Sequence, residues 1–177
     1  MNENIHEKGI TLIQLLLIVF LVGIIATIAL PNYMAAIRSA NGASALETMR
    51  LLQSVEATYS SSIGEGNFGT TNDLFYQDFI DTQLASAISP YPTSTISKWG
   101  QVLLPKQSAH VGFKFTLTTL PSKLPLLPRY HVEAIPKIQL GPTRTGNRAF
   151  YLDETGVIRA SQNATSIANK LSTPLSM

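Results

Sequence analysis

The segment KGITLIQLLLIVFLVGIIATIALPNY, residues 8–33, decides how the rest of this 177-residue chain can be arranged. From Ile10 to Leu30 it carries no charged residue over 21 positions. A helix rises about 1.5 Å per residue, so this run would extend about 31 Å, close to the hydrocarbon thickness of a bilayer. A cleaved secretory signal has a shorter apolar run followed by a small-x-small cleavage site. The segment therefore predicts a transmembrane helix over residues 10–30.

Both flanks of the apolar run carry further sequence signals. The polar stretch MNENIHEKG ends in Gly9, and Ile10-Thr11-Leu12-Ile13-Gln14-Leu15 follows directly. Gly23 lies inside the run, which closes with Pro31-Asn32-Tyr33. Over about 25 residues this segment resembles the N-terminus of bacterial type IV pilins and pseudopilins. In that family a short polar leader ends in glycine before a hydrophobic helix that begins Thr-Leu-Ile-Glu-Leu.

The resemblance implies a processing step and a destination. A prepilin peptidase would cleave between Gly9 and Ile10 and methylate Ile10, so that residues 1–9 are a leader. The mature helix would lie in the bacterial inner membrane with the head in the periplasm, and later in a filament beside other pilin or pseudopilin subunits. Lys8 is offset by Glu3 and Glu7, so this orientation rests on the resemblance more than on the positive-inside rule.

Gln14 occupies the position at which most members of the family have glutamate. A glutamate there would neutralise the amino terminus of a neighbouring subunit, because a buried unpaired charge is costly. Gln14 keeps the shape and can accept a hydrogen bond, but it brings no charge and is easier to hold in lipid. Subunits at a filament tip can lack the glutamate, because no subunit above them presents an amine. Gln14 therefore favours a minor or tip-proximal subunit.

Gly23 and Pro31 both weaken the predicted helix. Pro31 cannot donate a hydrogen bond to the carbonyl of Thr27, so we expect a gentle kink there. This can be a tolerated kink in a membrane helix, or it can allow the span between the two residues to unwind locally. In the family, such melting lets helices pack in the filament core, and both interpretations remain open here.

Beyond Pro31 the chain becomes amphipathic. Six apolar residues recur at spacings of three and four and so share one helical face: Ala45, Met49, Leu52, Val55, Tyr59 and Ile63. Such a stripe is more typical of a core contact than of a binding site. The glycine-rich loop at residues 64–69 should end the helix, which predicts one helix over residues 10–62.

Residues 63–177 are expected to form a globular head. A helical or turn region is predicted over residues 71–88, with Asn72 or Asp73 as its cap. Residues 112–117 and 130–135 alternate as strands with one wet face, and residues 149–160 predict a hairpin that turns at Gly156. The tail after Ser161 is expected to be a loosely packed extension. The predicted fold class is α+β, a long helix on an antiparallel sheet of three to five strands, as in pilins.

No set of residues in the sequence argues for catalysis. There are no cysteines, and His110 and His131 lie in unrelated local contexts. Asp153 and Glu154 could contribute to a calcium site, but two adjacent carboxylates are more often part of a turn. We therefore expect a structural protein that is not an enzyme and that needs no cofactor or metal.

The charged residues are segregated along the chain. Residues 47–81 hold six acidic residues and one basic, a charge of about −5, whereas residues 98–148 hold eight basic and one acidic, about +7. These blocks could be opposed surfaces that meet between neighbouring heads of a type IV pilus or type II secretion pseudopilus. Alternatively, the basic block of a minor pilin could contact DNA during uptake, although aromatic residues are sparse there beyond Trp99, Phe113 and Tyr130. A third alternative is a plain membrane-anchored periplasmic domain, for which the Gly9 signal would be coincidental.

Overall fold

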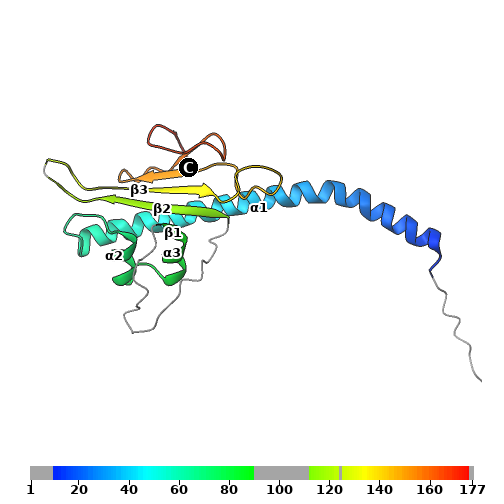
Figure 1. The fold of residues 1–177 in the computed structure, drawn as a ribbon, viewed down its shortest axis with the longest axis horizontal. Coiled ribbons are helices and arrows are strands. Elements are labelled where there is room, and N and C mark those ends of the chain that lie inside the picture. Colours follow the sequence, from blue (N-terminus) through cyan, green and yellow to red (C-terminus); the bar gives the residue numbers. More distant parts are fainter. Residues whose placement is uncertain (1–9, 90–111, 124, 176–177) are drawn as a thin grey trace, which may run out of the picture. The chain divides into compact units, whose positions relative to one another are not determined.

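The computed structural model describes residues 10–89, 112–123 and 125–175 (Figure 1). The predicted leader therefore lies outside the described residues. The chain divides into two compact units, residues 1–36 and 37–177. The helix residues 37–62 thus belong to the same unit as the strands that follow them.

The first unit consists, in its described part, of the beginning of helix α1, which spans Leu12–Ser62. The prediction of one long helix over residues 10–62 is confirmed within two residues at its start. Pro31 lies inside the helix, and the helix continues through it without a break. In the described part of the chain, α1 is the one helix long and apolar enough to cross a membrane, judged by length and composition.

The second unit contains a six-stranded sheet in the order β1-β2-β3-β4-β5-β6. The strands are β1 (Ile88–Ser89), β2 (Phe113–Leu120), β3 (Arg129–Pro136), β4 (Phe150–Asp153), β5 (Arg159–Ala160) and β6 (Thr173–Pro174). Strands β2 to β6 pair antiparallel, which confirms the predicted α+β layout. Strand β1 was not predicted and pairs parallel with β2.

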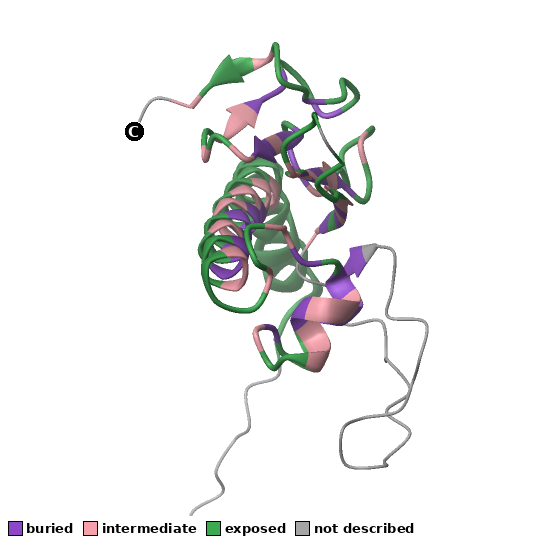
Figure 2. Cartoon of the chain, turned by 90° about the vertical axis from the view of Figure 1, so that its left-hand side faces the viewer, coloured by how far each residue is buried: buried purple, intermediate pink, exposed green. Residues whose placement is uncertain are grey.

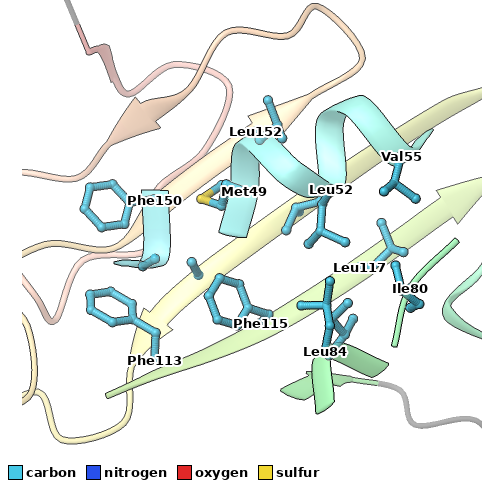
Figure 3. Packing of buried hydrophobic residues seen from close by; sticks show 14 of the residues in the cluster. Met49, Leu52, Val55, Ile80, Leu84, Phe113, Phe115, Leu117, Phe150 and Leu152 are labelled. Atoms are coloured by element: carbon cyan, nitrogen blue, oxygen red, sulfur yellow. The ribbon is translucent and has the colours of Figure 1, made fainter. Parts of the chain in front are cut away.

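The core of the second unit lies between α1 and the sheet (Figure 3). The predicted stripe on α1 supplies Met49 and Leu52, which are fully buried, with Ala45 and Val55 beside them. Tyr59 is partly buried against this core, but Ile63 is half exposed because α1 ends at Ser62. The prediction for Ile63 was wrong. Figure 2 shows the buried positions where helix and strands meet, and exposed positions on the outer turns of α1.

The two long strands alternate as predicted. On β2 the aromatic residues Phe113 and Phe115 are buried, whereas Lys114 between them is exposed. On β3 Val132 and Ala134 are buried, and Glu133 between them is partly exposed. The apolar side chains on the inner face of the sheet therefore pack with those of the α1 stripe and form one hydrophobic layer between helix and sheet.

Two short helices, α2 (Thr71–Tyr76) and α3 (Thr82–Ala87), follow α1. The N-cap of α2 is Thr70, in a capping box with Asp73, so the prediction of Asn72 or Asp73 as the cap was wrong. Asp73 lies at the third helical position, where its side chain accepts from the Thr70 amide at 2.9 Å. Asp81 is the N-cap of α3.

The C-terminal part of the unit is more ordered than expected. Strands β4 and β5 form the predicted antiparallel hairpin, with Gly156 at a positive φ of 75°. The tail was predicted to be loosely packed, which was wrong. Strand β6 pairs with β5, and both Ala164 and Ala168 are buried.

Candidate functional site

Gln14 takes part in the N-terminal cap of α1. The Thr11 amide donates to Gln14 Oε1 at 3.0 Å, and the Gln14 amide lies 3.4 Å from Thr11 Oγ1. This is the reciprocal arrangement of a capping box, which satisfies two amides that a helix start otherwise leaves without partners. The sequence contains the Thr-x-x-Gln spacing of this box, but Gln14 was expected to matter as a hydrogen-bond acceptor without charge and not as part of a cap. A neutral amide can therefore perform this local task in apolar surroundings.

The other sequence-predicted assembly residues are spread along the same helix. Gly9 lies outside the described residues, and Ile10 is exposed just before the helix begins. Apart from its two chain neighbours and the nearby backbone of its own helix, no described atom lies within 4 Å of the position that a Cβ would occupy on Gly23, so packing does not require a glycine there. The structure thus arranges Gln14, Gly23 and Pro31 in sequence along α1 and does not gather them into one cluster.

The apolar side chains of the first unit are exposed to a degree that is unusual for a soluble protein. Leu12, Phe20 and Ile28 are 80%, 66% and 66% exposed. The first helical turn holds no acidic residue. Such a continuous apolar surface indicates a site that contacts lipid or other helices.

A second polar site, which the sequence analysis missed, lies where α1 enters the second unit. The buried Asn41 donates from Nδ2 to the Thr145 carbonyl at 2.9 Å, and Arg38 Nη1 donates to the Pro142 carbonyl at 3.2 Å. Thr145 Oγ1 in turn donates to the Gly112 carbonyl at 2.6 Å. These contacts fix the loop of residues 137–145 on α1, and only the polarity of Asn41 within an apolar face could have signalled them.

Gly112 is required at this site. Its φ is +80°, and a Cβ on it would come within 2.6 Å of Asn41 Nδ2. A residue with a side chain would therefore meet both backbone strain and a steric clash there.

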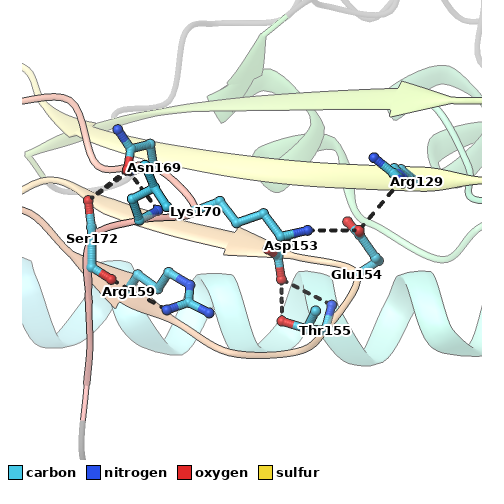
Figure 4. A network of polar contacts seen from close by, with 9 residues as sticks. Arg129, Asp153, Glu154, Thr155, Arg159, Asn169, Lys170 and Ser172 are labelled. Carbon is cyan, nitrogen blue, oxygen red and sulfur yellow. Dashed lines mark hydrogen bonds and ion pairs between the residues drawn. The ribbon is translucent and has the colours of Figure 1, made fainter.

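Asp153 and Glu154 belong to a polar network that connects the β4–β5 turn with the tail (Figure 4). Asp153 is buried, and its Oδ1 accepts from the amide of Thr155 at 3.0 Å and from the Thr155 hydroxyl. Lys170 Nζ lies 3.9 Å from Asp153 Oδ2 and 3.5 Å from Glu154 Oε1, and Arg129 Nε lies 4.0 Å from the same Glu154 oxygen. The two carboxylates thus face cations of the chain, an arrangement that stabilises the turn.

The remaining polar candidates show no metal-binding geometry. His131 stacks on Tyr151 with ring centroids 5.7 Å apart. Among the residues that the structure describes, no group of three or more histidine, aspartate or glutamate residues could hold a metal ion. His110 lies outside the described residues.

Glu56 is the most strongly perturbed acid of the second unit. It is fully buried on α1, where Oε2 accepts from the Gly69 amide at 2.9 Å and Oε1 has no partner within the described chain. Burial raises the pKa of Glu56 to about 7, the Gly69 amide opposes part of this shift, and the nearby Asp73 adds to it. Burial also raises the pKa of Tyr130, and the Glu56 charge adds to that effect. The sequence signal was the i+4 spacing from Leu52, which places Glu56 on the core face.

The charge blocks do not form two uniform surfaces. Within the acidic block Glu56 is buried, Asp73 takes part in the capping box of α2, and Asp81 is the N-cap of α3. Within the basic block, Lys98 and Lys106 lie outside the described residues. Its six described members are exposed but lie in two groups. Lys123 and Arg129 lie at one end of the β2–β3 hairpin, whereas Lys114 lies near the other end, which Lys137, Arg144 and Arg148 follow. An eight-residue strand, about 23 Å long, separates the two groups.

No protein-family model matches this chain, and no solved structure matches it. The structure therefore defines the class of this protein only by its fold. It is an α+β protein whose long N-terminal helix begins as a candidate membrane anchor and ends as part of the core of the second unit.

Proposed function

We propose that this chain is a structural subunit, in a minor or tip-proximal place, of a type IV pilus or a type II secretion pseudopilus. It is processed after Gly9 and polymerises through the apolar part of α1. The observation that carries the proposal is the resemblance of residues 8–33 to the prepilin N-terminus. The exposed apolar surface of the same residues supports it, because that surface needs lipid or other helices as a partner.

The continuity of α1 gives the proposal a physical basis. One helix carries the apolar surface from Leu12 onward and supplies the buried residues Met49 and Leu52 to the core of the second unit. A subunit built in this way could leave the bilayer and enter a filament while its head remains folded. In both places the surroundings of the apolar segment would be other apolar groups, so the transfer would expose little apolar surface to water.

The capping box at Gln14 supports a minor place for the subunit. Gln14 Oε1 is already bonded to the Thr11 amide of its own helix, and it carries no charge with which to neutralise the amino terminus of a neighbour. A subunit without a subunit above it needs no such neutralisation. We therefore assign Gln14 to the helix start and not to a contact between subunits.

The test is the mass of the mature N-terminus in cells that contain a prepilin peptidase. The expected product begins with methylated Ile10 and has lost the nine leader residues. Gly9→Val should abolish the cleavage, because the peptidase reads the residue before the cut. Gly23→Ala is the matched control and should be cleaved normally, since a Cβ at residue 23 would meet no described atom within 4 Å beyond its chain neighbours and the backbone of its own helix. Intact Met1 in the membrane fraction would instead identify a plain anchored periplasmic domain.

DNA uptake by a minor pilin remains the alternative activity. It predicts that the full chain in neutral nanodiscs retains duplex DNA at low salt and loses it steeply as salt rises. The separation of the described basic residues into two groups makes a continuous DNA-binding surface less favourable. Absence of retention at low salt would remove this alternative.

A further inference from the structure

Basic side chains gather at one end of the β2–β3 hairpin, where it lies beside α1. At this end Arg38 and Asn41 of α1 donate hydrogen bonds to carbonyl groups in the loop of residues 137–145. Lys114 lies at the same end, because β2 begins at Phe113 and pairs antiparallel with the last residues of β3. We call this region the basic end and define it by five cationic residues: Arg38, Lys114, Lys137, Arg144 and Arg148.

The basic end has no acidic residue in the segments that form it. Residues 37–46, 112–118 and 137–149 contain neither aspartate nor glutamate. None of the five cationic side chains forms an ion pair with a carboxylate of the described residues. Uncompensated cations at one end of a folded unit create a positive potential there, which attracts an anionic surface.

Apolar side chains lie exposed among these cations. Leu140 is 73% exposed, Ile138 is 46% exposed, and Ile37 of α1 is 40% exposed. Exposed apolar and basic side chains together are typical of a surface that lies in the interface of an anionic bilayer, where cations meet headgroups and apolar groups enter the acyl boundary. Contacts with the phosphates of DNA would use the cations but would leave these apolar side chains in water.

The loop of the basic end is held in one shape by its own hydrogen bonds. The Gly112 carbonyl accepts from Thr145 Oγ1 at 2.6 Å and from the Lys137 amide at 2.8 Å. The Thr145 amide donates to the Ile138 carbonyl at 2.9 Å. A loop that is already ordered loses little conformational entropy when it docks.

The covalent chain keeps the basic end within reach of the predicted membrane segment. Arg38 lies eight positions after Leu30, the last residue of the apolar run. Eight residues can extend by at most about 29 Å, and this limit holds for any arrangement of the two units. A bilayer that holds the apolar part of α1 is therefore always near the basic end, and this tethering favours its headgroups over an acidic protein free in solution.

We propose that the basic end docks on anionic lipid headgroups of the bilayer that holds the apolar part of α1. Lys137 and Arg144 lie against the lipid phosphates, and Leu140 enters the interface. The proposal rests on the membrane insertion of α1 in the proposed function, but it does not require cleavage at Gly9 or assembly into a filament. The docking is reversible, because salt screens the attraction.

The test uses the full chain in nanodiscs of phosphatidylcholine, either alone or with phosphatidylglycerol in equal amounts. All discs also contain a phospholipid with a nitroxide on its headgroup, which quenches a fluorophore that comes close to it. Because the chain has no cysteine, Thr143→Cys provides a single labelling site in the exposed part of the loop. The expected result is stronger quenching in the anionic discs than in the neutral ones, and high salt should abolish the difference.

The matched control is a label at the opposite end of the hairpin. Leu127→Cys is suitable, because Leu127 is 79% exposed there. Its quenching should be the same in the two kinds of disc.

Charge variants that carry the label at residue 143 measure the ratio of docked to undocked molecules. The double substitution Lys137→Gln and Arg144→Gln should lower this ratio in anionic discs by on the order of tenfold or more, since each cation contributes roughly fivefold. Lys123→Gln with Arg129→Gln removes the same charge at the opposite end and should leave the ratio unchanged. Leu140→Ser should lower the ratio several-fold, because its apolar burial is lost.

Four outcomes would overturn the proposal. Equal quenching at residue 143 in the two kinds of disc would do so, as would an undiminished ratio in the Lys137 and Arg144 double variant. A response of this label to duplex DNA in neutral discs, with none to anionic lipid, would assign the basic end to nucleic acid instead. Failure of the chain to elute with either disc would overturn the membrane anchor and the docking together, whereas elution without quenching would overturn the docking alone.

Thermal unfolding of each variant in the same discs checks that the second unit remains folded. The comparison of the two lipids at residue 143 decides the proposal even where a charge variant unfolds.

Discussion

Glu56 connects the folding of the second unit to pH through a single buried carboxyl group. Its pKa is raised from the usual 4.5 to about 7 by burial, with Tyr59, Asp73 and Tyr130 as its titratable neighbours. A raised pKa means that the folded state favours the protonated form. The contribution of this group to stability is therefore fully present below about pH 4.5 and is lost as pH rises through 7.

Glu56→Gln should remove this pH dependence. At pH 8 the variant should be more stable than the parent by up to about 3 kcal/mol, because the neutral amide can still accept from the Gly69 amide without the cost of a buried charge. At pH 4 the two should be nearly equal. Denaturant unfolding of the full chain in micelles between pH 4 and 8 measures this, with the exposed Glu47→Gln as control. Parallel curves for parent and Glu56→Gln would contradict the prediction.

Gly112 permits a direct comparison of two costs at the residue scale. Gly112→Ala must accept a positive φ of 80° and also displace Asn41, so we expect a loss of about 2–4 kcal/mol in unfolding free energy. Gly141→Ala has the same backbone requirement, at φ +82°, but no neighbour within 4 Å, and should lose about 1–2 kcal/mol. Chemical unfolding of both variants gives the difference. Equal losses would show that Asn41 moves aside without cost.

At the scale of elements, the sequence predicted those parts whose periodicity is long. The stripe from Ala45 to Val55 extends over about three helical turns, and β2 alternates between buried and more exposed residues from Phe113 to Thr118, so both were found. Strands β1 and β6 have two residues each, which leaves no period to detect. Their pairing depends on tertiary contacts that no local pattern encodes.

The residues of the candidate site also divide into those that a local sequence pattern predicted and those that depend on tertiary contacts. Gly9, Ile10, Gln14, Gly23 and Pro31 came from a local motif and a resemblance. The hydrogen bonds from Arg38 and Asn41 to the loop of residues 137–145 each join residues 104 positions apart, and no local sequence pattern identified the acceptors. Glu56 and the Thr11–Gln14 cap did have local signals, but a charged residue on a core face and a polar pair before an apolar run both allow other interpretations.

Pro31 gives a prediction at the element scale. It lies inside α1 and leaves the Thr27 carbonyl without the amide donor four residues later. Pro31→Ala would supply that donor, so backbone amides over residues 28–34 should exchange with solvent deuterium several-fold more slowly in micelles. Gly23→Ala raises helix propensity by about 1 kcal/mol without adding a hydrogen bond near residue 31, and it should leave that exchange unchanged. Unaltered exchange in Pro31→Ala would mean that the helix is already fully protected there.

At the scale of the whole molecule, the proposed function predicts how Gln14 affects assembly. Gln14→Glu should increase the incorporation of the subunit along the filament shaft, because the new carboxylate can neutralise the amino terminus of a neighbour. It also retains the acceptor for the Thr11 amide. Immunogold labelling along sheared filaments would measure the effect.

Gln14→Ala separates charge from capping in this assay. It removes the acceptor without adding a charge, so it should weaken the helix start by about 1 kcal/mol and should not increase incorporation. If Gln14→Glu leaves incorporation unchanged or lowers it, the missing charge is not what limits the subunit.

Because α1 is one continuous helix from Leu12 to Ser62, a pull on its first turn is transmitted along its backbone toward the buried stretch of Met49 and Leu52. Between these two stretches the helix lacks one backbone hydrogen bond, because Pro31 has no N–H to donate to the Thr27 carbonyl. Under load this turn should lengthen before the buried turns are drawn out of the core. The helix would then extend locally and reversibly at Pro31 while the head remains folded.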